Sequence, residues 1–217
     1  SMPAAYLNYV ERFGTTSRST PLSLGWVRDS RDSPIVPTRG GLSRVYSDWA
    51  VAGDTRYVRY GGGHQQHIPL TKQYSIALNA DLGFGKGLSG YPYPVFKNYF
   101  VGGLGSVRGF DQGSLGPRDL TGLILGGTKK VVMNAEFQMP FPGAGNDRTL
   151  RLYTFLDAGN VYGEYDKIDV STLRSSFGMG FSWVSPMGPL RLAIARPITK
   201  FAGDRILPLQ FQVGNTF

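Results

Sequence analysis

The sequence predicts an all-β fold, an antiparallel transmembrane β-barrel of about eight strands. Apolar and polar residues alternate with a period of two, over segments as long as a barrel strand needs to cross a membrane. Glycine, proline, asparagine and aspartate separate these segments. The connections are unequal, being short after residues 139 and 184 and very long between 87 and 128. A soluble sandwich also alternates, but long segments joined by such unequal connections favour the membrane barrel.

Nine segments carry the strand pattern, and the first is the weakest. In the clearest segment, 129–139, Phe137 belongs to an apolar face and Glu136 to a polar face. Phe137, together with Leu78 and Phe181 of other segments, is expected to face lipid. Eight strands are the smallest usual count for a closed barrel. We expect the barrel to close by pairing of an early strand with residues 207–217. A half barrel that pairs with a second copy is the alternative. The segments are 20–28, 40–52, 55–69, 72–86, 129–139, 149–162, 172–184, 189–198 and 207–217.

The chain divides into an N-terminal segment and a barrel segment. Residues 1–20 are expected to form an arm or a short helix, beginning with Ser1 and Met2, which are typical of an expression-vector remnant. Residues 21–217 are expected to supply C-terminal transmembrane strands, with a long extracellular loop at 88–128 that folds into the lumen.

Composition argues against most enzyme classes. The chain has 217 residues, no cysteine and only two histidines, so disulfides, thiolate metal sites and cysteine nucleophiles are excluded. His64 and His67 are three residues apart on an expected strand and face opposite sides. The net charge of +8 comes from scattered lysines and arginines without a nucleic-acid motif. We therefore expect no catalysis, no metal, no cofactor and no nucleic-acid partner.

Tyr93 and Tyr99 are expected in an aromatic girdle at the membrane edge.

One cation and two acids are expected to meet inside the barrel. Strand parity turns Glu136 and Asp157 inward on neighbouring strands, directly after the long loop. A loop that folds back into the lumen carries Arg108 towards them, and the planar guanidinium can bind one carboxylate with two nitrogens while it reaches a second acid. The alternative is that each charge is solvated separately in a wet lumen.

The residues around Arg108 also carry a family resemblance. The segment Gly102–Phe110 contains Val107-Arg108-Gly109-Phe110 and resembles the loop motif of the BamA family of outer-membrane assembly factors. Further matches are Gly116-Pro117, Ala135-Glu136-Phe137, Leu156-Asp157-Ala158-Gly159, Ser185-Pro186-Met187-Gly188-Pro189-Leu190 and the end Phe211-Gln212-Val213-Gly214-Asn215-Thr216-Phe217. The resemblance implies a sixteen-stranded barrel preceded by soluble periplasmic domains, of which this chain holds only the C-terminal strands. It also implies that the motif arginine anchors the loop in the lumen.

The resemblance implies a function in the bacterial outer membrane. The chain is expected to be the barrel portion of a machine that folds and inserts β-barrel proteins. A last strand carrying Leu209, Phe211, Val213, Gly214 and Phe217 would form the seam with the first strand. The expected partners are the lipid bilayer with lipopolysaccharide or detergent, nascent outer-membrane proteins and, in the full-length protein, assembly-complex lipoproteins. A transporter that secretes one specific protein and a passive pore are the alternatives.

Overall fold

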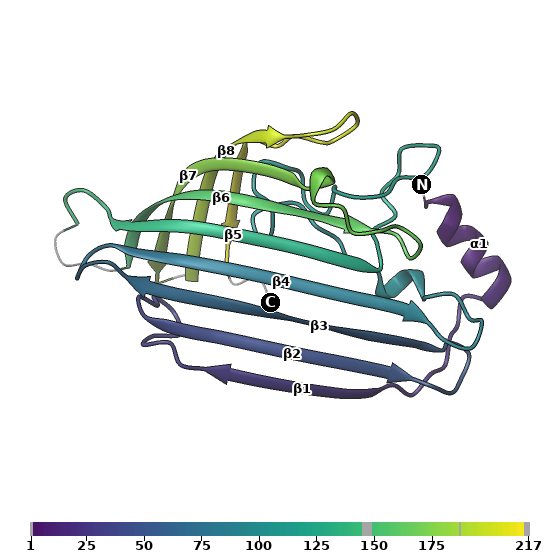
Figure 1. The fold of residues 1–217 in the computed structure, drawn as a ribbon. Coiled ribbons are helices and arrows are strands. Elements are labelled where there is room, and N and C mark those ends of the chain that lie inside the picture. Colours follow the sequence, from purple (N-terminus) through teal and green to yellow (C-terminus); the bar gives the residue numbers. More distant parts are fainter. Residues whose placement is uncertain (1, 145–148, 187, 215–217) are drawn as a thin grey trace.

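The sheet is antiparallel throughout, which confirms the all-β class. The computed structural model describes residues 2–144, 149–186 and 188–214, and in these ranges nine strands follow one another in chain order across a single sheet (Figure 1). One α-helix, α1 (Ala4–Phe13), precedes the sheet. The strands are β1 (Leu22–Asp29), β2 (Gly40–Ala50), β3 (Tyr57–Pro69), β4 (Ser75–Gly87), β5 (Lys129–Pro140), β6 (Leu150–Tyr162), β7 (Arg174–Ser185), β8 (Gly188–Thr199) and β9 (Leu209–Val213).

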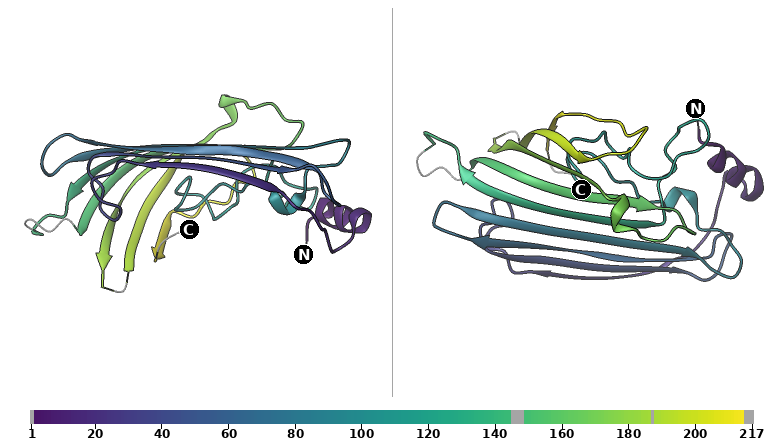
Figure 2. Two further views of the ribbon diagram at one scale, coloured as in Figure 1. Left: turned by 90° about the horizontal axis from the view of Figure 1, so that it is seen from below. Right: turned by 45° about the horizontal axis from the view of Figure 1, so that its top comes forward.

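The expected closure is wrong, whereas the strand count agrees with the expectation of about eight. Nine strands form in the described ranges, because the weak first segment becomes β1 and pairs with β2 along its whole length. Within the described ranges no ladder joins β1 to β9, which lie at the two margins of the sheet. The diameter of a barrel grows with its strand number, and the open arch in Figure 2 has the gentle curvature of a wall that belongs to a wider barrel.

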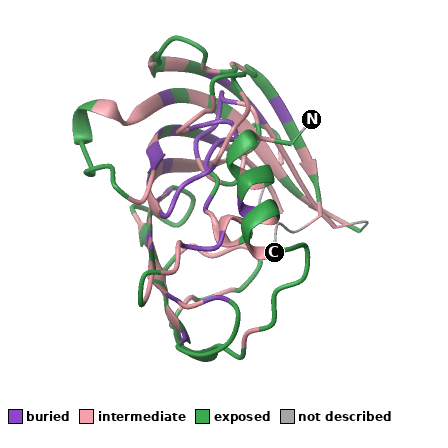
Figure 3. Ribbon diagram, turned by 90° about the vertical axis from the view of Figure 1, so that its right-hand side faces the viewer, coloured by how far each residue is buried: buried purple, intermediate pink, exposed green. Residues whose placement is uncertain are grey.

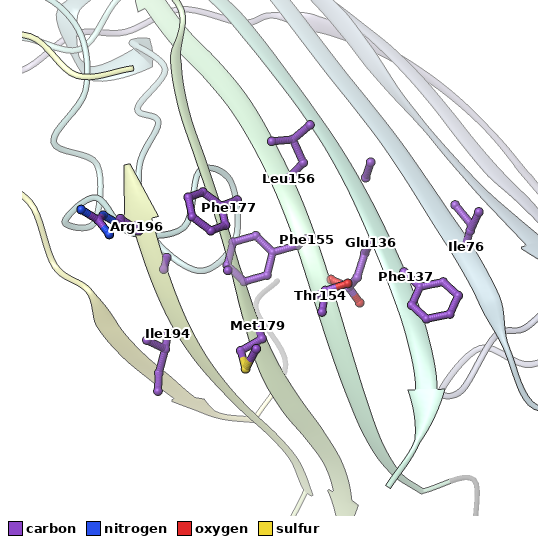
Figure 4. Close-up of a pocket in the computed structure, with 13 residues that line it drawn as sticks. Ile76, Glu136, Phe137, Thr154, Phe155, Leu156, Phe177, Met179, Ile194 and Arg196 are labelled. Atoms are coloured by element: carbon purple, nitrogen blue, oxygen red, sulfur yellow. The ribbon is translucent and has the colours of Figure 1, made fainter. Parts of the chain in front are cut away.

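The two faces of the arch have opposite chemistry, as the alternation predicts. On the convex face Leu78 is 43% exposed and Phe177 50% exposed, and neighbouring apolar side chains line a shallow hollow there (Figure 4). On the concave face the acids Glu136 and Asp157 are buried, at 9% and 0% exposure. Because an antiparallel sheet that places charge on its covered face and apolar groups on its exposed face is inverted relative to a soluble protein, the convex face is suited to lipid.

The connection from β4 to β5 covers the concave face. It leaves the sheet at residue 88, returns at 128 and lies under the arch, as the left view of Figure 2 shows. Buried residues gather where this connection meets the strands (Figure 3). Helix α1 packs against the same connection, since the Tyr6 hydroxyl donates hydrogen bonds to the carbonyls of Val95 and Leu125, at 3.2 and 3.1 Å. We call residues 88–128 the inner loop from here on.

The assignment of faces leads to a mutational prediction. Leu78→Arg should lower the free energy of unfolding by about 2–4 kcal/mol in phospholipid vesicles, because it places a charge on the lipid side of β4. Ser182→Asn, on the concave face of β7, should have a much smaller effect. Urea titration followed by tryptophan fluorescence measures both. Equal losses would indicate a core packed on both faces of the sheet.

Candidate functional site: an arginine buried under the arch

Glycine lets the inner loop approach the wall closely. Gly109 has a φ of +89°, a conformation that side chains with a Cβ rarely adopt, and a Cβ there would lie 2.9 Å from the Cβ of Ala195. On either side, Val107 and Phe110 are fully buried in an apolar cluster with Val132 and other residues of the loop and wall. The Val107–Phe110 motif is therefore held by apolar packing at both ends, with Arg108 turned into the wall between them.

Asp157 binds Arg108 at three points. The Arg108 Nε and Nη2 atoms donate to Asp157 Oδ2 and Oδ1, at 2.7 and 2.8 Å. The Arg108 backbone N–H also donates to Oδ2, at 3.0 Å. Asn134, which lies opposite Asp157 in the β5–β6 register, donates a further hydrogen bond to Oδ1, at 2.8 Å. The carboxylate is fully buried, so these donors replace the water that it loses.

Glu136 completes the coordination of Arg108 and links it to β8. Arg108 Nη1 donates to Glu136 Oε2 at 2.7 Å, and Arg191 Nη2 approaches the same oxygen at 3.0 Å. Gln138 donates to the other oxygen, at 2.8 Å. Two arginines thus face two carboxylates, and the cluster has no formal net charge. This balance matters because an uncompensated charge in a desolvated site costs several kcal/mol.

An aromatic ring covers the guanidinium. The Arg108 Cζ atom lies 3.6 Å from the centroid of the Phe155 ring, which is the distance of a cation stacked on a π face. Glycine makes room for this ring, since a Cβ on Gly178 of β7 would lie 2.7 Å from Phe155 Cζ. The structure therefore brings together Arg108, Glu136 and Asp157, as the parity argument expects. Their role as an anchor stays a prediction.

Several partners in this cluster were not singled out from the sequence. Arg191 alternates with apolar residues on β8, and this parity could have assigned it to the concave face. Ser176 of β7 donates to the carbonyl of Arg108, and Asn134 donates to the carbonyl of Ser106 at 2.6 Å. These contacts bind the backbone of the loop, so composition gives no sign of them.

A second contact between loop and wall seats tyrosine rings on glycines. A Cβ on Gly83 would lie 2.6 Å from Tyr99 Cζ, and a Cβ on Gly85 would lie 2.3 Å from Tyr93 Cε2. Both rings are buried, at 5% and 4% exposure, under the arch. Their expected place in a membrane-edge girdle is therefore wrong, because alternate glycines on β4 open slots on its concave face that rings from the loop fill.

The remaining candidates lie apart from this cluster. His64 is bonded to Ser43 on one face of β3, whereas His67 is buried on the other. In the described part of the chain, no three His, Asp or Glu side chains are grouped so that they could hold a metal ion. None of the helices in the described ranges is long and apolar enough to span a membrane.

Leu209, Phe211 and Val213 of β9 are exposed, while Phe217 lies outside the described residues.

Sequence comparison assigns the chain to a family. A family described as the Omp85 superfamily domain matches residues 3–217, nearly the whole chain. The chain belongs to the Omp85 superfamily. The resemblance to BamA is confirmed by a relative from Neisseria meningitidis, named outer membrane protein assembly factor BamA, which is 33% identical over 99% of this chain. This Omp85 chain also resembles the mouse sorting and assembly machinery component 50 homolog, with 30% identity over 93% of this chain.

Structural comparison gives the same assignment. BamA from Haemophilus ducreyi lacking POTRA domains 1–3 superposes with a TM-score of 0.88 and 26% identity, over 97% of this Omp85 chain and 47% of that structure. The chain spans about a third of the Neisseria relative, 32%, and 46% of the mouse relative. This chain therefore matches less than half of that structure, and in the described ranges its arch stays open between β1 and β9.

The buried cation leads to a prediction for the loop. Arg108→Ala should destabilise the protein by about 3–5 kcal/mol, because it leaves two carboxylates without their shared partner. The inner loop should then become a substrate for chymotrypsin, chosen because its cleavage sites do not include arginine. Arg196→Ala, which removes an exposed arginine from the convex face of β8, is the matched control. Resistance to chymotrypsin equal to that of the unmodified chain would refute the anchor.

The glycine seats lead to a second prediction. Gly83→Ala should displace the Tyr99 ring and raise the rate of proteolysis of the inner loop, because the new methyl group has no space. Gly63→Ala on β3 is the control, since its nearest contact would be 3.3 Å from a carbonyl oxygen. If both variants are cleaved at the same rate, the seat of Tyr99 does not hold the loop.

Proposed function

We propose that this chain forms the last part of the barrel wall of a non-enzymatic machine that folds and inserts β-barrel proteins in the bacterial outer membrane. The observation that carries the proposal is the margin at β9, a strand edge without a ladder partner in the described ranges, in a wall that the inner loop contacts through Arg108 and Asp157. Support comes from the two relatives whose names say that they are outer membrane protein assembly factors or assembly machinery components.

The mechanism follows from the cost of unpaired backbone in a membrane. Each N–H or C=O group without a partner in hydrocarbon is costly, so the edge of β9 favours pairing with an extended strand. A strand that is added there has its own groups paired before the rest of its barrel exists. The Arg108 cluster keeps the shape of the wall while the strand is added, because its contacts reach β5, β6 and β8.

The proposal includes partners beyond the chain itself. Nascent outer-membrane proteins are the substrates, and the convex apolar face contacts the lipid bilayer and lipopolysaccharide. The lipoproteins of an assembly complex are proposed as partners of a protein as long as the Neisseria relative. This chain spans about a third of that length.

A reconstitution experiment tests the function. Liposomes that contain the chain should fold an unrelated eight-stranded barrel protein faster than empty liposomes, as measured by the gel-mobility shift of the folded form. Failure to accelerate folding would overturn the proposal. Export of one cognate protein without faster folding would support a secretion transporter instead, and ion conductance alone would support a passive pore.

A further inference from the structure

The loop motif pairs with the chain just before β9 as a short extra strand. Phe110 and Ile206 form an antiparallel bridge. Around it, the Leu207 N–H donates to the carbonyl of Gly109 at 3.0 Å, and the Asp111 N–H donates to the carbonyl of Arg205 at 2.9 Å. Residues 109–111 therefore lie beside residues 205–207 with the hydrogen-bond pattern of a sheet.

Strand geometry identifies which edge this extra strand occupies. The N–H and C=O of one residue in an antiparallel strand point to the same side, and successive residues alternate. The Ala195 N–H donates to Pro208 and the Gly214 N–H donates to Pro189, both at 2.8 Å, so even-numbered residues of the last strand face β8. Odd-numbered residues face away from β8. The motif thus covers residues 205 and 207 of the same edge that stays open at Leu209, Phe211 and Val213.

Gln210 fastens the motif from the concave side. Its Oε1 atom accepts from the Gly109 N–H at 3.0 Å, and its Nε2 atom donates to the Phe110 carbonyl at 2.7 Å. The side chain is only 6% exposed, and both ends of the amide are used. Gln212, the other inward glutamine of β9, donates to the carbonyl of Gly214 in its own segment and so provides a natural comparison.

We propose that residues 109–111 are a register stop, which ends the edge available for strand addition at Leu209, and that Gln210 is the positioning residue that holds them there. A strand that pairs along the outer edge of β9 reaches the motif after Leu209. It cannot pair further along this edge, because residues 205 and 207 already have partners. This inference rests on the proposed function, since it assumes that the edge accepts a strand.

Amide exchange tests the position of the motif without any assembly reaction. In the unmodified chain in detergent, the Leu207 N–H should exchange slowly and the Leu209 N–H quickly, as followed by NMR. Gln210→Leu should speed exchange at Leu207 by about tenfold, because two hydrogen bonds that fix the motif are lost. Gln212→Leu should leave that rate unchanged. Equal rates at Leu207 and Leu209 in the unmodified chain would overturn the inference.

A second variant protects the test against misfolding. Gln210→Met has nearly the same length and stays uncharged, but it makes neither hydrogen bond to the motif. It should speed exchange at Leu207 about as much as Gln210→Leu does. A Gln210→Met chain that folds with unchanged exchange at Leu207 would show that the amide does not hold the motif.

Crosslinking tests the register directly, since the chain contains no cysteine. The probe is a seven-residue peptide of alternating valine and threonine with one cysteine. It should form a disulfide with Leu209→Cys and not with Leu207→Cys, and adding Gln210→Leu should allow the second crosslink. Equal crosslinking at both positions without Gln210→Leu would overturn the register stop while strand addition stands. Crosslinking at neither position would overturn strand addition itself, and with it the register stop.

Discussion

Placing a guanidinium under the arch imposes a condition on the whole wall. Arg108 is buried, so its two carboxylates must reach it from fixed positions on β5 and β6. In the β5–β6 ladder Asp157 lies opposite Asn134, and Glu136 lies opposite Phe155. A slip of one residue between these strands would turn one acid towards lipid, where it has no partner. We therefore expect the ion cluster to favour this register of the strands as well as this position of the loop.

The other contacts of the inner loop are arranged around this condition. The Tyr93 and Tyr99 rings fill slots in β4 at one end of the loop, and Val107 and Phe110 pack into an apolar cluster around the motif. Arg191 shares Glu136 and extends the cluster to β8. Because these contacts reach β4, β5, β6 and β8, we expect the 88–128 connection to brace this part of the arch.

The sequence predicts the faces of the strands much better than the contacts between distant segments. Period-two alternation is local, so it places Leu78 outward and Glu136 and Asp157 inward without knowledge of the fold. Closure is not local, because it depends on curvature accumulated over the whole sheet, and the expected closure between an early strand and residues 207–217 fails there. The inward rings of Tyr93 and Tyr99 were missed for a similar reason, since the glycines that receive them belong to another segment. Gln210 binds backbone atoms, which leave no trace in residue types.

The contact between Gln210 and the loop motif also constrains the order in which the chain folds. The two partners are 100 and 101 residues apart along the sequence, and β5 to β8 lie between them. Contacts of such high sequence separation form only after the intervening chain has lost most of its freedom, because closing a long loop early is entropically unfavourable. We therefore expect the four intervening strands to pair before the motif meets the last strand. Docking of the loop on Gln210 should then be a late step of folding, preceded by a partly folded wall with an undocked loop.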